Sequence, residues 1–599
     1  MNVSTPTVAP EPFRSGAAPA AEPWHDYTPR TPRDFIAVRA ATTDMDAWYA
    51  HVAPAAACSR PVRLVGHRLS IEAATGRLLS SVDTDRMPDG TIYKACGDRR
   101  TSVCPACAKV YQRDAYQLLR AGLVGGKGVP ETVSAHPASF LTVTAPSFGP
   151  VHTRVVAKHT CAKRSRCDCR PNPCRARTGT NDPQTCKHGA PAVCFARHEP
   201  ADLRLGRPLC LDCYDHEHHV VWNAFSGELW RRTKQKAERH LAKLAEDRGI
   251  PPVLIGWTDE DEPILVPPVR ISHGKAAEYQ RRGVVHFHAL TRLDGVAKLD
   301  ADAIVPPPAG FTYTDLDAAL HAAVAHTAFN TPEHPDRTPE HPDRADGWPM
   351  AWGEQVDVRP VALTGTTVTD QMVAGYLAKY ATKSTEVTGH RSVRITGETI
   401  ADYANPDGDH IARLIEACWV LGRPQYTPVP MTERTIRRKA TNLGQPWTCP
   451  DCGRRTRLTA CLVCYPSRQA ALDSKYHGGK PDSRNKYARL RRWAHMLGFG
   501  GHFLTKGHHY SVSFAVLRAA RIDFHRAETN PEADPVVRTA DHTDEETTLI
   551  VGALTFAGIG WHNTGDALLA NTSAALARAR REAARDELAH RAGSAVAAR

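Results

Sequence analysis

The sequence predicts a mixed α+β protein that is braced by zinc-binding modules. A segment at 284–290 is apolar apart from two histidines, which is typical of a buried strand. A segment at 376–383 repeats two tyrosines and a lysine at helical spacing. Several of the seventeen cysteines stand in Cys-x-x-Cys pairs, which in a reducing compartment indicate bound zinc rather than disulfides.

The strand predicted at 284–290 carries His286 and His288. Residues i and i+2 of a strand point to the same face, so we expect both imidazoles to converge on one point. Glu278 lies before His286, across a segment with Gly283 that is typical of a turn or bulge. Two imidazoles and a carboxylate make a labile site for Mg²⁺ or Mn²⁺. The alternative is a pair of core histidines that are satisfied by hydrogen bonds.

The helix predicted at 376–383 places Tyr376, Tyr380 and Lys383 on one stripe, because they stand at i, i+4 and i+7. A phenol has a pKa of about 10 and is a poor nucleophile at neutral pH unless a metal activates its target. A second tyrosine one helical turn away allows a second transfer. Lys383 either offsets charge on a phenolate or a phosphate, or is a solvated lysine at the helix end. The alternative for both tyrosines is packing in a core.

The residues at 278–290 and 376–383 resemble the motifs of HUH endonucleases that initiate rolling-circle replication. More closely, the chain is similar to the replication initiators of actinobacterial plasmids and integrative elements. The strand expected at 140–147 resembles the first motif of that family. Further likeness lies at 104–107 and 492–503, and the resemblance covers most of the chain. It implies an HUH-type nuclease domain in which helices flank a central antiparallel sheet, with the histidine strand at its centre.

The resemblance implies that the protein nicks one strand of plasmid origin DNA and later rejoins it. Attack by a tyrosine leaves a 5′-phosphotyrosyl link and a free 3′-OH, which conserves the phosphodiester energy and offers a polymerase its primer. Some related initiators carry a glutamate at the position of Tyr376, so Tyr380 is expected to be the nucleophile. Two alternatives stay open. One is a two-tyrosine HUH transposase or relaxase, and the other is a non-catalytic zinc-ribbon DNA-binding regulator whose histidines and tyrosines belong to the core.

The composition favours a nucleic-acid partner and a cytoplasmic protein. The chain of 599 residues has a formal net charge of +12 and a pI of about 9.0, which favours a polyanionic partner. It has no run of about eighteen apolar residues and no signal-peptide pattern, so we expect neither a membrane protein nor a secreted one. No Gly-x-x-x-x-Gly-Lys-Ser/Thr motif occurs, so we expect no nucleotide cofactor and a host helicase as the unwinding partner.

Three groups of cysteines are predicted to bind Zn²⁺. The first is a zinc ribbon whose ligands are Cys449, Cys452, Cys461 and Cys464. The second contains a Cys-Pro-x-Cys knuckle, and its ligands are Cys58, Cys96, Cys104 and Cys107. The third is a basic segment whose eight thiols can bind two zinc ions in a pairing that the sequence leaves open. Its members are Cys161, Cys167, Cys169, Cys174, Cys186, Cys194, Cys210 and Cys213, with His188, His198 and His216 among them. This segment is expected either to touch DNA phosphates or to act as a purely structural staple.

These landmarks predict six segments along the chain. They are a disordered N-terminal segment at 1–50, a zinc-knuckle module at 51–135, an HUH nuclease domain at 136–390 with the Cys-rich insertion at 161–216, a helical connector at 391–444, the zinc ribbon at 445–470, and a basic, aromatic C-terminal region at 471–599. A proline-rich tandem repeat at 331–344 predicts an exposed loop with solvent-exposed histidines. In 482–521 cations alternate with aromatic residues. This mixture is typical of surfaces that bind a nucleic-acid backbone and stack bases, or of an ordinary fold with a basic outside.

Overall fold

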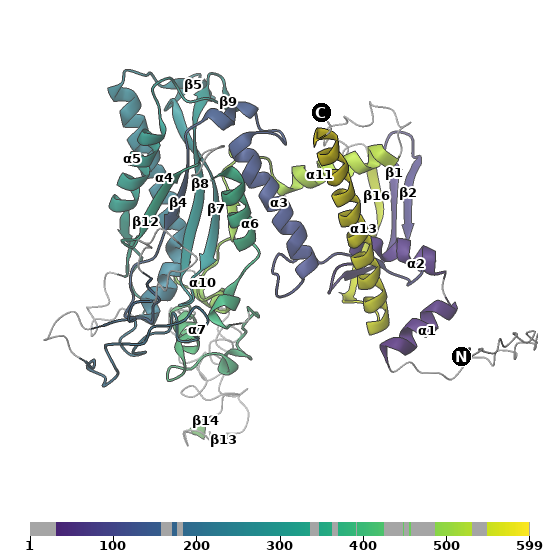
Figure 1. The fold of residues 1–599 in the computed structure, drawn as a ribbon, viewed down its shortest axis with the longest axis horizontal. Helices are drawn as coiled ribbons and strands as arrows, with labels where there is room; N and C mark the ends of the chain where they lie inside the picture. The colour runs from purple at the N-terminus through teal and green to yellow at the C-terminus, as the bar shows by residue number, and fades with distance from the viewer. Residues whose placement is uncertain are drawn as a thin grey trace, which may run out of the picture. The chain divides into compact units, whose positions relative to one another are not determined.

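The computed structural model describes residues 31–42, 44–156, 171–176, 184–335, 347–361, 369–390, 392–423, 447–448, 455–456, 485–529 and 548–597. The chain divides into two compact units. One comprises residues 1–96 with 543–599, and the other comprises residues 97–542. Each unit combines helices with antiparallel strands, which confirms the α+β class (Figure 1).

The first unit contains a four-stranded antiparallel sheet to which both ends of the chain contribute. Its strands are β1 (Val62–Glu72), β2 (Leu78–Asp83), β3 (Ile92–Lys94) and β16 (Thr548–Ile559), in the order β16-β1-β2 with β3 paired to β1. Its helices are α1 (Pro32–Thr42), α2 (Met45–Val52) and α13 (Thr564–Ala597). Trp48 and Tyr93 are buried in its core, and the guanidinium of Arg39 on α1 donates to the carboxylate of Asp566 at 2.9 and 2.7 Å. Apolar burial and this buried ion pair therefore join the N-terminal helices to the C-terminal one.

The second unit is built on a six-stranded antiparallel sheet. Its strands are β4 (Ala138–Val143), β7 (Val269–Tyr279), β8 (Val285–Ala297), β9 (Asp300–Val305), β12 (Val356–Pro360) and β15 (Leu504–Lys506). The strand order is β12-β4-β8-β7-β15, with β9 paired to β8. The strand with both motif histidines, β8, therefore lies in the interior of the sheet between β4 and β7 (Figure 1).

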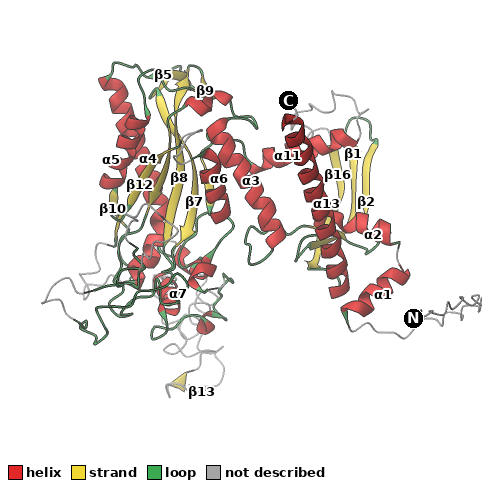
Figure 2. Ribbon diagram, in the orientation of Figure 1, coloured by secondary structure: helices red, strands yellow, loops and turns green. Residues whose placement is uncertain are grey.

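Helices cover both faces of this sheet (Figure 2). The first face packs against α4 (His216–Asp247) and α5 (Tyr313–His326), and the second against α3 (Pro105–Val124) and α6 (Asp370–Tyr380). Successive residues of β8 serve opposite cores, because side chains alternate along a strand. Phe287 belongs to the core under α4, whereas Leu290 packs with Leu377 of α6. The sheet is thus an internal layer with two separate apolar interfaces.

The second unit contains further helices and strand pairs besides these layers. They are the helices α7 (His410–Leu421), α10 (Arg489–Arg492) and α11 (Phe514–Thr529), and the strand pairs β5 (Val253–Trp257) with β6 (Pro263–Val266), β10 (Ala328–Asn330) with β11 (Pro349–Ala351), and β13 (Trp447–Thr448) with β14 (Arg455–Thr456). Among the helices that the structure describes, none is both long enough and apolar enough to cross a membrane.

A buried polar network fixes β8 at the end opposite its histidines. Arg292 and Asp294 are fully buried, and the Arg292 Nε atom donates to the Asp294 carboxylate at 2.6 Å. The same carboxylate accepts a hydrogen bond from Ser272 at 2.6 Å and lies 2.7 Å from His136 Nδ1. Arg292 also donates to the carbonyl of His509 at 2.9 Å. Because buried charges are tolerated only when they are paired and hydrogen-bonded, these contacts specify how β7, β8 and the 507–510 turn come together.

The prediction of solvent-exposed histidines in the tandem repeat is wrong for His334. This side chain is only 7% exposed, lies 3.4 Å from the carboxylate of Glu217, and packs its ring 4.8 Å from that of Trp348. The reason is a backbone hydrogen bond of 2.9 Å from Thr331 to Trp348, which brings the start of the repeat back onto the fold. The remainder of the repeat, at 336–344, lies outside the described residues.

Lys275 on β7 is buried in the first core, with its ammonium 3.6 Å from the ring centre of Phe287. Burial lowers the pKa of Lys275 to about 7, whereas an unfolded lysine titrates near about 10.4. Between these pH values the unfolded chain binds a proton that the folded chain does not, so the free energy of unfolding rises with pH.

We expect Lys275→Met to raise the free energy of unfolding near neutral pH by an amount on the order of a few kcal/mol, because the variant no longer deprotonates an amine on folding. This gain should shrink as the pH rises toward about 10. Denaturant unfolding of both proteins across this range measures the difference, with Lys109→Met on the exposed side of α3 as control. A gain that is independent of pH would contradict the assigned cause.

Candidate active site

The β7–β8 hairpin brings Glu278 and His286 to directly opposed positions in the sheet. Its turn is closed by the backbone amide of Gln280, which donates to the Val284 carbonyl at 2.8 Å. Gly283 adopts a φ of +87°, a conformation that L side chains rarely adopt, so the turn favours glycine here. The spacing of eight residues between the acid and the histidine is therefore the spacing of a tight hairpin.

Three ligand atoms converge at this hairpin. The Nε2 atom of His286 lies 3.1 Å from Glu278 Oε2 and 3.2 Å from the Nε2 atom of His288, and His288 Nε2 lies 3.4 Å from the same carboxylate oxygen. Burial alone would raise the pKa of Glu278, but the hydrogen bonds to both histidines outweigh it and the pKa is lowered. Burial lowers the pKa of His288, which favours the neutral imidazole that a metal requires. The three groups can hold one divalent cation.

Two further side chains orient these imidazoles, and the sequence interpretation missed both. The hydroxyl of Thr142, which stands opposite His288 in the β4–β8 register, lies 2.9 Å from His288 Nδ1. The side-chain amide of Gln280 lies 3.3 Å from His286 Nδ1. A partner at Nδ1 leaves Nε2 free to face a metal. The one sequence signal for a role in orienting an imidazole was that Thr142 lies in the strand expected at 140–147.

Helix α6 carries both tyrosines toward the histidines. It begins at the cap of Thr369, whose hydroxyl accepts from the Met372 amide at 3.3 Å, and it packs Leu377 into the second core. The Tyr376 hydroxyl lies 3.4 Å from His288 Nε2, and the Tyr376 and Tyr380 rings lie 4.4 Å apart. The two tyrosines and the three ligand side chains therefore form one group.

The electrostatic surroundings of the two tyrosines differ. Burial, the carboxylate of Glu278 and the neighbouring Tyr380 all raise the pKa of Tyr376, so its phenol resists ionisation. The ammonium of Lys383 instead lies 4.3 Å from the ring centre of Tyr380. Tyr380 therefore has a cation beside its ring, whereas Tyr376 lies near a carboxylate.

The prediction that Lys383 continues the helix is wrong in its geometry, because α6 ends at Tyr380. The Lys383 amide donates to the Tyr380 carbonyl at 3.0 Å in a turn, and Arg99 binds the carbonyls of Ala381 and Lys383 at 2.9 and 2.7 Å. These bonds replace the helical ladder. The turn nevertheless returns the ammonium to the tyrosine pair.

The predicted zinc ligands fall in different parts of the structure. Cys58 and Cys96 belong to the first unit, where the Cys96 backbone amide donates to the Cys58 sulfur at 3.3 Å. Cys104 and Cys107 lie at the start of α3, which belongs to the second unit. The ribbon ligands Cys449, Cys452, Cys461 and Cys464 and the insertion cysteines Cys161, Cys167 and Cys169 lie outside the described residues. The other five cysteines of the insertion gather with histidines in two groups of four side chains.

The aromatic residues of 482–521 belong mainly to the core. Phe499 and Phe503 are buried in the first core and Tyr510 in the second, so they are not free to stack on bases. Tyr487 is also buried, and its hydroxyl donates to Thr331 at 2.8 Å. The interpretation of this segment as an ordinary fold with a basic outside is therefore the better one for these residues.

Comparison with known proteins identifies the family to which the chain belongs. A family model described as "Replication initiator protein, pSAM2" matches residues 44–575, so the chain belongs to this family of replication initiators. It is 33% identical over 564 residues to a replication initiator protein of Streptomyces ambofaciens, an alignment that covers 93% of this chain and 96% of the relative. These matches confirm the resemblance noted in the sequence. No solved structure matches the chain.

Proposed function

We propose that this protein starts rolling-circle replication by nicking one strand of its plasmid origin at an HUH-type endonuclease site. Membership in a replication initiator family supports the process. The observation that carries the chemistry is the convergence of His286, His288 and Glu278 beside the Tyr376–Tyr380 pair. An initiator that only bound DNA would have no need for a ligand set next to two phenols.

The five side chains divide the reaction among them. The Nε2 atoms of the two histidines and the carboxylate of Glu278 would hold Mg²⁺ or Mn²⁺, which would polarise the scissile phosphate and offset the charge that develops on it. Thr142 and Gln280 orient the imidazoles for this role. A phenol oxygen attacks phosphorus and loses its proton, while the 3′ oxygen leaves. The product is a 5′-phosphotyrosyl bond and a free 3′-OH that can prime a host polymerase.

Tyr380 is assigned as the first nucleophile because Lys383 lies against its ring, whereas burial and Glu278 oppose ionisation of Tyr376. Tyr376 lies next to it and is assigned the second transfer, which rejoins the displaced strand. The two rings are close enough for one activated phosphate position to serve both.

Two sets of four cysteines are assigned structural Zn²⁺, since closed sets of four thiolates leave no open position for substrate. They are the zinc ribbon at Cys449, Cys452, Cys461 and Cys464 and the group of Cys58, Cys96, Cys104 and Cys107. Origin DNA is the macromolecular substrate. Strand separation falls to a host helicase in the cytoplasm, because the sequence has no phosphate-binding Gly-x-x-x-x-Gly-Lys-Ser/Thr motif.

Tyr380→Phe removes one hydroxyl and leaves a ring of similar shape in place. We therefore expect loss of the covalent adduct with the strand 3′ of the nick, with little change in origin binding. A labelled origin oligonucleotide and a denaturing gel measure the adduct. Tyr403→Phe, whose ring packs beside that of His390, is the matched control. If Tyr380→Phe still forms the adduct and Tyr376→Phe does not, the order of the nucleophiles is reversed.

Nicking should depend on added Mg²⁺ or Mn²⁺. The variant His288→Ala should not nick, and its affinity for Mn²⁺ should fall at least about tenfold, because it keeps only two of the three ligands. Manganese titration followed by electron paramagnetic resonance measures binding, and circular dichroism checks the fold. His321→Ala, on the exposed side of α5, should behave as the wild type. Undiminished nicking by His288→Ala would exclude the metal-assisted mechanism.

A further inference from the structure

The Cys-rich insertion has few apolar side chains to hold it together. Phe195 and Leu203 are 63% and 91% exposed. Among the described residues between 150 and 210, the strand-type backbone pairing consists of isolated bridges such as that of Arg175 with Cys194. A segment that buries so little apolar surface needs covalent or metal cross-links to keep one conformation. The cysteines of this segment that the structure describes form no disulfides, so disulfides do not supply the cross-links here.

We propose that this insertion binds two zinc ions in an interleaved arrangement. The first site is formed by His152, Cys174, Cys194 and His198, and the second by Cys186, His188, Cys210 and Cys213. In chain order the second site takes two ligands between Cys174 and Cys194 of the first. The two sites therefore do not follow one another along the chain. Their ligands alternate in the sequence, so each ion would cross-link loops that overlap with those of the other.

The first site has the dimensions of a tetrahedral zinc centre. His152 Nδ1 lies 3.2 Å from His198 Nε2 and 3.8 Å from the Cys174 sulfur, and the Cys194 sulfur lies 3.6 Å from His198 Nε2. Zinc bonds of about 2.0 Å to nitrogen and about 2.3 Å to sulfur place tetrahedral ligands roughly 3.3 to 3.8 Å apart. Asp202 lies 2.7 Å from His198 Nδ1 and thereby directs the other ring nitrogen toward the metal, as carboxylates do in zinc proteins.

The second site combines three thiols with one imidazole. His188 Nδ1 lies 3.3 Å from the Cys213 sulfur and 3.7 Å from the Cys210 sulfur. The Cys186 sulfur completes the group, and all four ligand atoms lie within 4.8 Å of one another. Both groups hold four sulfur and nitrogen ligands and no carboxylate. Such closed sets select Zn²⁺ over Mg²⁺ or Ca²⁺, which require oxygen ligands.

The first site is joined to the catalytic hairpin. Arg281, in the β7–β8 turn, donates to the carbonyls of Pro200 and Asp202 at 2.6 and 3.1 Å, so the loop that carries His198 is bound to this turn. Gly206 lies so close that a Cβ atom there would come within 2.7 Å of the Arg282 amide nitrogen. A zinc ion in the first site would therefore position the turn next to His286.

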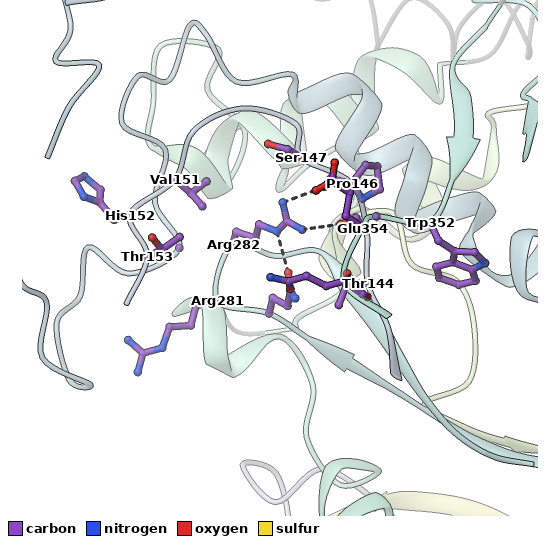
Figure 3. Close-up of a pocket in the computed structure, with 15 residues that line it drawn as sticks. Thr144, Pro146, Ser147, Val151, His152, Thr153, Arg281, Arg282, Trp352 and Glu354 are labelled. Atoms are coloured by element: carbon purple, nitrogen blue, oxygen red, sulfur yellow. Dashed lines mark hydrogen bonds between the residues drawn. The ribbon is translucent and has the colours of Figure 1, made fainter. Parts of the chain in front are cut away.

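The same contacts form one wall of a cavity of about 650 Å³ (Figure 3). His152 and Thr153, which precede the insertion in the sequence, line it on one side, and Arg282 donates to the carbonyl of Pro146 at 3.2 Å. Gln280 lines it as well and contacts His286. The first zinc site would thus position one side of this cavity, which Gln280 connects to His286. Its effect on nicking rests on the function proposed above.

Metal analysis of the full-length chain, purified without chelators, tests the assignment. Relative to the wild type, Cys194→Ala and Cys213→Ala should each lose one zinc per chain, and the double variant should lose two. Cys418→Ala, which removes a buried thiol outside both groups, should keep the wild-type count. An unchanged count in either single variant, or a loss of two ions in one of them, would overturn the two-site arrangement.

A ligand exchange keeps the test decisive if an alanine variant fails to fold. His152→Cys should retain the ion that His152→Ala loses, and after cobalt replacement it should show stronger thiolate-to-metal absorption than the wild type. Loss of the ion in His152→Cys as well would show that the position is not a ligand.

Nicking assays separate the positioning role from the proposed chemistry. We expect His152→Ala to nick at least tenfold more slowly with unchanged Mn²⁺ affinity, and His152→Cys to recover the rate. If His152→Ala and His152→Cys nick at the same rate, the positioning role is wrong, whereas the zinc assignment from the metal analysis is unaffected. A wild type that fails to nick would instead refute the endonuclease function and leave the zinc assignment intact.

Discussion

The antiparallel pairing of β7 with β8 is the interaction on which the candidate site depends. It sets Glu278 against His286 and Ala276 against His288, so the acid and both imidazoles reach the same side of the sheet. A slip by one residue would send the acid to the opposite face. The register is fixed from both ends, by Gly283 in the turn and by the buried Arg292–Asp294 network at the far end.

Alternation along β8 lets one strand serve the core and the chemistry. Residues on the first face, such as Phe287, pack under α4, while the second face carries the histidines and then Leu290. Helix α6 lies on that second face because Leu377 is buried there, and this packing aims Tyr376 at His288. The histidines, Glu278 and the tyrosines are therefore held by strands and a helix rather than by loops, and such support would give the proposed reaction the fixed geometry that it requires.

Parts of the chain outside these layers depend on other means of support. In the described part of the segment between β4 and α4, Phe195 and Leu203 are exposed, and cysteines and histidines gather in two groups of four. In the proposed arrangement, zinc bound to these groups would take over the role that apolar side chains play elsewhere. Arg281 binds the loop that carries His198 to the β7–β8 turn, so such support would extend to this hairpin. A motif that is remote in sequence from the histidine strand thus contributes to the shape of the site.

The sequence by itself determined the class of fold, the strand of His286 and His288, the family, and the residue types at the site, because strand alternation and helical spacing are local properties of the chain. It did not determine where α6 ends, so Lys383 was expected on the helix, and it did not predict the burial of His334. Only the tertiary structure decided three further features. They are the contact of Thr142 with His288, the pairing of β16 with β1, and the gathering of insertion cysteines into two groups, one of which includes His152 from outside the expected segment. Each of these joins residues that are distant in the sequence, and such contacts depend on packing rather than on local spacing.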